Sequence, residues 1–191
     1  MKLKSEKNHQ VIFQGLMILA FLTVLQLPAM AGMTAAEIDK KVDLALENLY
    51  ANTPAAREIA KVAKGVLVFP EIIKAGLVVG GQYGEGALRI DGKTVGYYNT
   101  VAASYGLQIG AQSFGYAMFL MNDKALEYLN KSSGWEVGVG PSIVVVDKGA
   151  ARSLTTSTAK EDIYAFFFNQ KGLMAGLGLQ GSKITRIHPD K

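Results

Sequence analysis

The sequence predicts an α+β protein in which N-terminal helices pack on a strongly curved, mostly antiparallel, glycine-rich β-sheet or partial barrel. Two observations lead to this prediction. Apolar residues first recur at helical spacing and then, from about residue 66, alternate as they do in strands. In this second part the motif Gly-Leu-x-x-Gly occurs three times, beginning at Gly76, Gly106 and Gly172.

Each copy of this motif lies in a β-prone run. Glycines four apart in a strand share one face, and a face without side chains lets another backbone approach closely or lets the sheet bend. The alternative is a close helix–helix contact of the GxxxG kind, but no copy lies in an apolar stretch of about twenty residues. We therefore expect the motif inside curved strands.

The first 31 residues have the pattern of a signal peptide. Three lysines precede an apolar stretch from Val11 to Leu27, and Ala29-Met30-Ala31 supplies the small-x-small pattern of a cleavage site. The apolar stretch is shorter than the roughly twenty residues of a membrane span. We expect cleavage after Ala31, export of the chain, and a single domain over residues 32–191; an uncleaved anchor is the alternative.

Composition excludes several classes of function. Removal of three lysines and Glu6 with the leader leaves 17 basic and 15 acidic residues, a net charge of +2 against +4 for the whole chain. This excess is too small for a dedicated nucleic-acid-binding protein. Cysteine is absent, so disulfides, thiolate metal sites and thiol nucleophiles are excluded.

Two helices are expected first. Thr34-Ala-Ala-Glu37 fits a capping box, and the apolar residues that follow recur at helical spacing. Asn52-Thr53-Pro54 ends this helix and starts the next, with Pro54 in the first helical position. The second helix is expected to run to about Lys64, before Gly65.

Strands are expected next, interrupted by one helix. Asp91-Gly92 is a strong hairpin signal, and Asn122-Asp123 caps a helix that ends near Lys131. Residues 148–162 are expected to form a loop or edge. The expected strands cover residues 66–69, 76–83, 87–90, 93–100, 103–112, 114–121, 135–139, 142–147, 163–169, 173–179 and 183–187.

Catalytic machinery, metal sites and cofactors are not expected. Once the leader is removed, the sequence retains a single histidine, His188, near its C-terminal end, and no paired His/carboxylate cluster. The glycine-rich run Gly80–Gly86 precedes a hairpin, whereas a phosphate-binding loop needs a helix directly after it. A hydrolase using Ser104 or Ser133 is an alternative, although no base is identifiable near either serine.

Basic residues of the expected second helix suggest a membrane contact. Arg57, Lys61 and Lys64 lie at i, i+4 and i+7, beside an apolar side of the helix, and Lys74 follows on the chain. Such a helix can rest on an anionic bilayer. The alternative is an ordinary packed helix with a solvated basic face.

Five sequence blocks resemble a known family. They are Ala63-Lys-Gly-Val-Leu-Val-Phe-Pro70, Gly84-Glu-Gly-Ala-Leu-Arg89, Gly106-Leu-Gln-Ile-Gly-Ala-Gln112, Ser133-Gly-Trp-Glu-Val-Gly138 and Lys171-Gly-Leu-Met-Ala-Gly-Leu-Gly-Leu-Gln-Gly181. In this order they resemble the SYLF domain, also called the Ysc84-type domain, from about Thr34 to Ile187. The resemblance implies a non-catalytic lipid-binding module. Eukaryotic relatives bind phosphoinositides through a basic amphipathic N-terminal region, and some bind or bundle actin filaments.

Carried over to this chain, the resemblance implies lipid contact at Arg57, Lys61, Lys64 and Lys74. Eukaryotic relatives usually carry a second module such as SH3 or FYVE, which this sequence lacks, so actin binding is not carried over. Ala31-Gly32 replaces the acylated cysteine of some bacterial relatives. We expect a bacterial exported member, periplasmic and peripheral to a membrane, with an anionic phospholipid as partner; a small outer-membrane β-barrel or a structural envelope protein is the alternative.

Overall fold

The computed structural model describes residues 32–76, 79–105, 110–131, 134–146, 151, 154–171, 179 and 181–190. These residues belong to one compact unit. The expected signal peptide, residues 1–31, and the third Gly-Leu-x-x-Gly copy, residues 172–176, lie outside them.

The N-terminal helices begin as the sequence predicts. Helix α2 (Ala35–Asn52) starts with a capping box, in which the Glu37 N–H donates to Thr34 Oγ1 at 3.3 Å and the Thr34 N–H donates to Glu37 Oε2 at 2.8 Å. Helix α3 (Pro54–Ala60) starts with Pro54 but ends at Ala60, four residues before the expected end. The residues that follow form a turn that leads into the first strand.

Eight strands form one curled sheet in the order β5-β8-β3-β2-β1-β4-β7-β6. All neighbouring strands are antiparallel except the β6–β7 pair. A third helix, α4 (Asp123–Asn130), follows β4. The strands are β1 (Gly65–Gly76), β2 (Val79–Ile90), β3 (Lys93–Tyr105), β4 (Gly110–Leu120), β5 (Trp135–Glu136), β6 (Ile143–Val146), β7 (Ile163–Lys171) and β8 (Lys183–Ile187).

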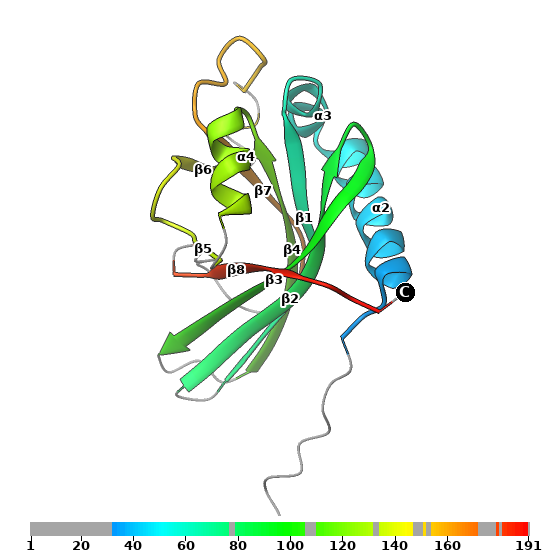
Figure 1. Cartoon of the computed structure of the whole chain (residues 1–191), viewed down its shortest axis with the longest axis vertical. Coiled ribbons are helices and arrows are strands. Elements are labelled where there is room, and N and C mark those ends of the chain that lie inside the picture. The colour runs from blue at the N-terminus through cyan, green and yellow to red at the C-terminus, as the bar shows by residue number, and fades with distance from the viewer. Residues whose placement is uncertain are drawn as a thin grey trace, which may run out of the picture. The chain divides into compact units, whose positions relative to one another are not determined.

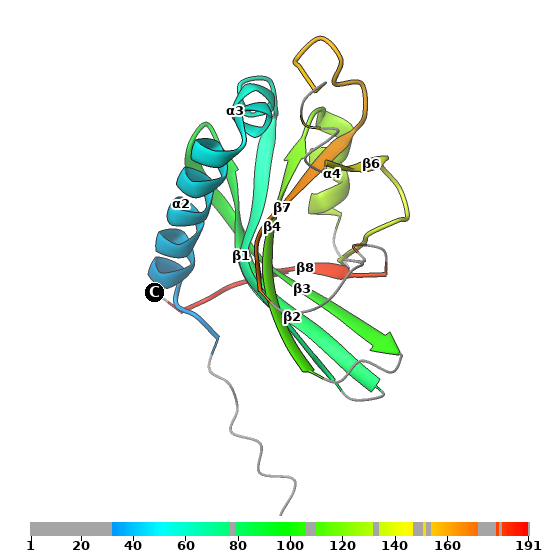
Figure 2. The same ribbon diagram turned by 180° about the vertical axis from the view of Figure 1, so that it is seen from behind.

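The sheet separates two apolar cores, and Figures 1 and 2 show α2 and α4 on opposite sides of it. On one side, Val66 and Val68 of β1 pack with the buried faces of α2 and α3. On the other side, Leu67 and Phe69 pack with α4 and Trp135. The α+β prediction of helices on a curved, mostly antiparallel sheet is therefore confirmed.

Close backbone approaches occur where β1 bends. Its register shifts between Val68 and Glu71 against β2, so the strand bulges and continues through Pro70 to Gly76. A methyl group at Gly86 would overlap the Val68 carbonyl oxygen, and one at Gly84 would lie 2.7 Å from the Glu71 carbonyl oxygen. Glycine is therefore required at these two positions because the strands come too close for a side chain.

Only parts of the first two Gly-Leu-x-x-Gly copies lie among the described residues, because residues 77, 78 and 106–109 fall outside them. Gly76 ends β1 and pairs with Gly80 of β2, so the first copy spans the connection between these strands. Of the second copy, the structure describes only Gly110, which begins β4 and also pairs with Gly76. The prediction that the first strand ends at Phe69 was wrong. Pro70 cannot take part in a regular ladder, but the bulge between Val68 and Glu71 accommodates it, so β1 continues to Gly76.

Candidate functional site

Three of the four basic residues expected at the site, Arg57, Lys61 and Lys64, lie around one corner of the molecule. Arg57 is on α3, whereas Lys61 and Lys64 lie in the turn between α3 and β1. Because α3 ends at Ala60, the three do not form the expected helical stripe. We call the surface formed by Arg57, Lys61, Val62 and Lys64 the α3–β1 corner; Figure 1 shows α3 and the start of β1 at one end of the sheet.

Each cation of the corner has a partner. Arg57 Nη2 donates to the Tyr50 carbonyl oxygen at 2.8 Å, and Lys61 Nζ lies 2.7 Å from Glu58 Oε1. Lys64 Nζ lies 3.7 Å from Asp123 Oδ1 at the start of α4. These pairs are exposed, so water screens them and each contributes about 0–1 kcal/mol. A phosphate group can therefore replace either carboxylate at little cost.

An apolar side chain lies between the two lysines. Val62 is 45% exposed, while Ile59 one turn earlier is fully buried against the sheet. The Lys64 N–H donates to the Leu120 carbonyl oxygen at 2.7 Å, which attaches this turn to β4. The corner is thus a turn, attached to β4, that exposes a valine flanked in sequence by two lysines.

Lys74, the fourth residue expected at the site, lies elsewhere. It is on β1, ten residues beyond Lys64, which corresponds to about 33 Å of extended chain. It pairs with Gln82 and Gln112, on the opposite sheet face from the one that α2 covers. The structure does not bring Lys74 together with the other three residues.

An exposed apolar patch, which the sequence did not reveal, lies on the sheet face that α2 only partly covers. Ile73, Tyr83 and Val101 are paired neighbours on β1, β2 and β3, and they are 50%, 47% and 45% exposed. The next row holds only alanine and glycine, at Ala75, Gly81, Ala103 and Ala111. We call these residues the sheet patch. Apolar patches of this kind mark contact surfaces, but this one depends on strand register, which local sequence does not show.

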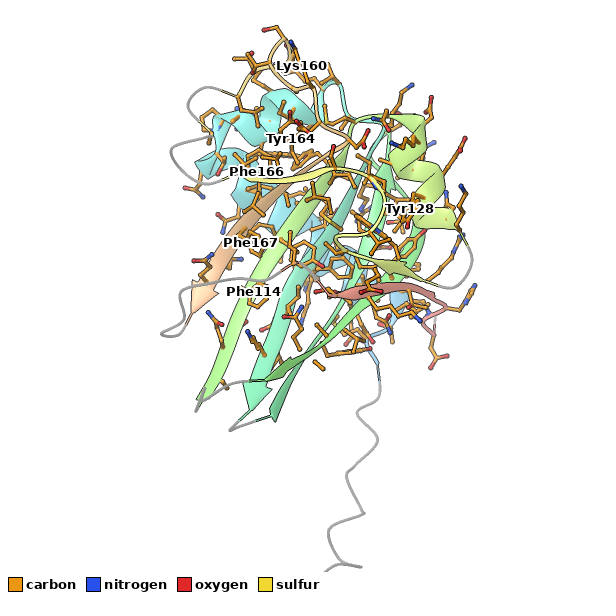
Figure 3. All side chains as sticks on the ribbon, turned by 90° about the vertical axis from the view of Figure 1, so that its left-hand side faces the viewer. Phe114, Tyr128, Lys160, Tyr164, Phe166 and Phe167 are labelled. Carbon is orange, nitrogen blue, oxygen red and sulfur yellow. The ribbon has the colours of Figure 1, made fainter. Side chains whose placement is uncertain are left out.

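A groove of about 1240 Å³ lies between the α2–α3 elbow and strands β6 and β7. Its lining combines apolar and amide side chains, including Leu49, Phe166, Phe168, Asn48, Asn52 and Asn169. Figure 3 shows Phe166 and Phe167 along β7. Phe166 is buried and packs edge-to-face on Phe119, with ring centroids 5.3 Å apart. Glu58, the partner of Lys61, also lines the groove.

Features of other site classes are absent from the described residues. They contain no group of three or more His, Asp or Glu residues that could hold a metal ion. Across the same residues, no helix combines the length and apolarity needed to cross a bilayer. His188 is exposed, and neither the side chain of Ser104 nor any part of Ser133 is among the described residues.

Part of the chain matches a known protein family. Residues 101–188 match the model of the protein family described as Ysc84: Las17-binding protein actin regulator. No curated protein matches the chain. The matched segment runs from β3 into the end of the chain and does not include the α3–β1 corner.

Proposed function

Because the chain belongs to the Ysc84 (SYLF) family through residues 101–188, a family linked to lipid binding and actin, we propose that it is a non-catalytic lipid-binding module. Its ligand is the surface of a membrane that contains anionic phospholipid, and the α3–β1 corner makes the contact. In this proposal the chain is exported after removal of residues 1–31 and is periplasmic and peripheral to the membrane.

The observation that supports this contact best is the position of Val62 between Lys61 and Lys64 in an exposed turn attached to β4. A cation near an anionic membrane surface contributes about 1 kcal/mol. Burial of the exposed part of a valine contributes about 1 kcal/mol more, at about 0.8 kcal/mol per CH₂ group. The sum of a few kcal/mol fits weak, reversible binding.

The neighbouring carboxylates reduce the local charge. Arg57, Lys61 and Lys64 supply three positive charges, whereas Glu58 and Asp123 supply two negative charges within 4 Å of the two lysines. Binding should therefore depend strongly on the fraction of anionic lipid and on salt, because the net attraction is small and screening acts over about 10 Å at 0.1 M salt.

Vesicle sedimentation tests the proposal. At low salt, the chain from Gly32 should sediment with vesicles of phosphatidylcholine and phosphatidylglycerol, and not with phosphatidylcholine alone. Replacing Arg57, Lys61 and Lys64 by Ala should abolish this binding. A control with the same loss of charge elsewhere, at Lys74, Lys131 and Lys183, should still bind. Equal loss of binding in both variants would show that net charge, and not the corner, is responsible.

A protein contact is the second candidate function, and the sheet patch favours it. The patch presents Ile73, Tyr83 and Val101 to solvent without a neighbouring element to cover them among the described residues. Cosedimentation with actin filaments, before and after Ile73→Asp and Val101→Asp, tests this candidate. If the wild-type chain does not sediment with filaments, the actin part of the family description does not extend to this protein.

A further inference from the structure

Glu85 is a buried carboxylate without a cation among the described residues. It lies on β2 and is 5% exposed. It accepts hydrogen bonds from the Met33 N–H at 2.8 Å and the Tyr83 hydroxyl at 2.5 Å. None of the ion pairs between described residues includes it. Acidic residues are seldom buried to this degree without a positive partner.

Gly32 lies directly against this carboxylate. A β-carbon at Gly32 would be 2.9 Å from Glu85 Oε1, so any side chain there would displace the carboxylate. The backbone nitrogen of Gly32 is joined to the same α-carbon, and bond lengths of about 1.5 Å place it within about 6 Å of that oxygen. At this distance an opposite charge favours the ionised form of a group.

We propose that Glu85 is the docking site for the α-ammonium group created at Gly32 when the chain is cleaved after Ala31. This inference rests on the export and leader cleavage of the proposed function. A signal peptidase uses one water molecule to hydrolyse the Ala31–Gly32 peptide bond: Ala31 leaves with a new carboxylate, and Gly32 keeps the nitrogen. That nitrogen is an uncharged amide before cleavage and a protonated amine afterwards.

The surroundings of Glu85 favour a cation on balance. On β1, Glu85 is paired in register with Glu71, whose carboxylate lies 3.2 Å from Lys41 Nζ of α2. On β3, Glu85 is paired in register with the uncharged Asn99. The Asp190 carbonyl oxygen accepts the Ala35 N–H at 2.8 Å, which brings a second acidic residue to the start of α2. The positive end of the α2 dipole opposes a cation there, and the carboxylate of Glu85 offsets this repulsion.

Cleavage therefore locks the N-terminal segment onto β2. In the precursor, the Met33 N–H links this segment to Glu85 through a backbone hydrogen bond, and the nitrogen of Gly32 carries no charge. In the processed chain, an ion pair with a buried carboxylate is added. The precursor is thus the less stable form, which suits a chain that must stay unfolded until it has been exported.

The decisive measurement is the pKa of the α-amino group in a chain released from a fusion so that it starts at Gly32. With ¹³C-methyl labels on this amine, NMR titration should give a pKa about one unit above the ordinary range of about 7.7–8.0. Glu85→Gln should return it to that range, and Asp190→Asn should leave most of the shift. An ordinary pKa in the wild-type chain would overturn the proposal.

Acetylation of the Gly32 amine gives a second test that does not depend on the folding of Glu85→Gln. Acetylated wild-type chain should have a lower thermal midpoint than the free-amine chain below pH 8, and the two midpoints should converge as pH rises above the raised amine pKa. Equal midpoints throughout would contradict the docking. Vesicle binding should be the same in both forms, so failure of the docking and failure of the membrane proposal are distinguishable.

Discussion

Replacement of Glu58 by Gln is predicted to strengthen binding to anionic vesicles. Glu58 Oε1 lies 2.7 Å from Lys61 Nζ, and the two side chains are 49% and 60% exposed. The substitution keeps the shape of the side chain but removes its negative charge. Lys61 then has no carboxylate competing with the lipid phosphate, and the net charge of the α3–β1 corner rises by one.

The size of the effect follows from two terms. Breaking an exposed ion pair costs about 0.2–1 kcal/mol of stability in both the free and the bound protein. One additional unit of positive charge near an anionic surface contributes about 1 kcal/mol, and this corresponds to about fivefold tighter binding. Asp123→Asn should act on Lys64 in the same way, so the double variant should bind about 25-fold more tightly at low salt.

Vesicle titration at two salt concentrations measures this change. Glu136→Gln serves as the matched control. Glu136 is exposed on the edge strand β5, which three strands separate from β1 in the sheet order. The gain should shrink when salt is raised, since the Debye length falls from about 30 Å at 0.01 M to about 10 Å at 0.1 M. If Glu58→Gln binds no better than Glu136→Gln, the reasoning that places lipid phosphate at Lys61 is refuted.

The other predictions concern stability. Gly86→Ala should cost about 4 kcal/mol or more in urea unfolding, because its methyl group would overlap the Val68 carbonyl oxygen, whereas Gly81→Ala should stay within about 0.5 kcal/mol. Arg89→Met should cost about 1–3 kcal/mol, since the guanidinium is nearly buried and bonds two aspartates of α2; no loss would show that these pairs do not stabilise α2. The pKa of Tyr83 is raised from 10.0 to about 12, mainly by burial and to a lesser extent by the hydrogen bond to Glu85 and its negative charge. The unfolded chain then loses this proton first, so stability should fall between about pH 10 and pH 12, and Tyr83→Phe should make the fall shallower.

Element starts and caps could be predicted because neighbouring residues determine them. The capping box at Thr34 and the cap at Asn122, whose Oδ1 accepts the Ala125 N–H at 2.9 Å, use residues within one helical turn. The hairpin at Asp91-Gly92 is also local, because both residues adopt positive φ, which this pair tolerates. These features need no knowledge of the rest of the fold.

The ends of strands could not be predicted, because pairing partners decide them. Gly76 ends β1 where it meets Gly80 and Gly110 on both sides, and the sequence around it is as β-prone as the strand itself. Conversely, β1 continues through Pro70 because a bulge accommodates the proline. Close approach of strands occurs at Gly84 and Gly86, which lie outside the Gly-Leu-x-x-Gly copies and were not singled out by the sequence.

The candidate site was predictable in part for the same reason. Arg57, Lys61 and Lys64 are near in sequence, so they are also near in space, even though the helix ends before two of them. Lys74 follows in sequence but lies along an extended strand, which separates residues far more than a helix does. The sheet patch arises from register across three strands, and no local pattern reveals it.

The position of the membrane relative to Val62 tests the central claim most directly. The chain contains no cysteine, so a single Val62→Cys or Ile73→Cys substitution can be labelled with an environment-sensitive fluorophore. On anionic vesicles, the label at residue 62 should shift to the blue and gain intensity, and the label at residue 73 should not change. A blue shift at residue 73 with no change at residue 62 would contradict the proposal and place the membrane on the sheet patch instead.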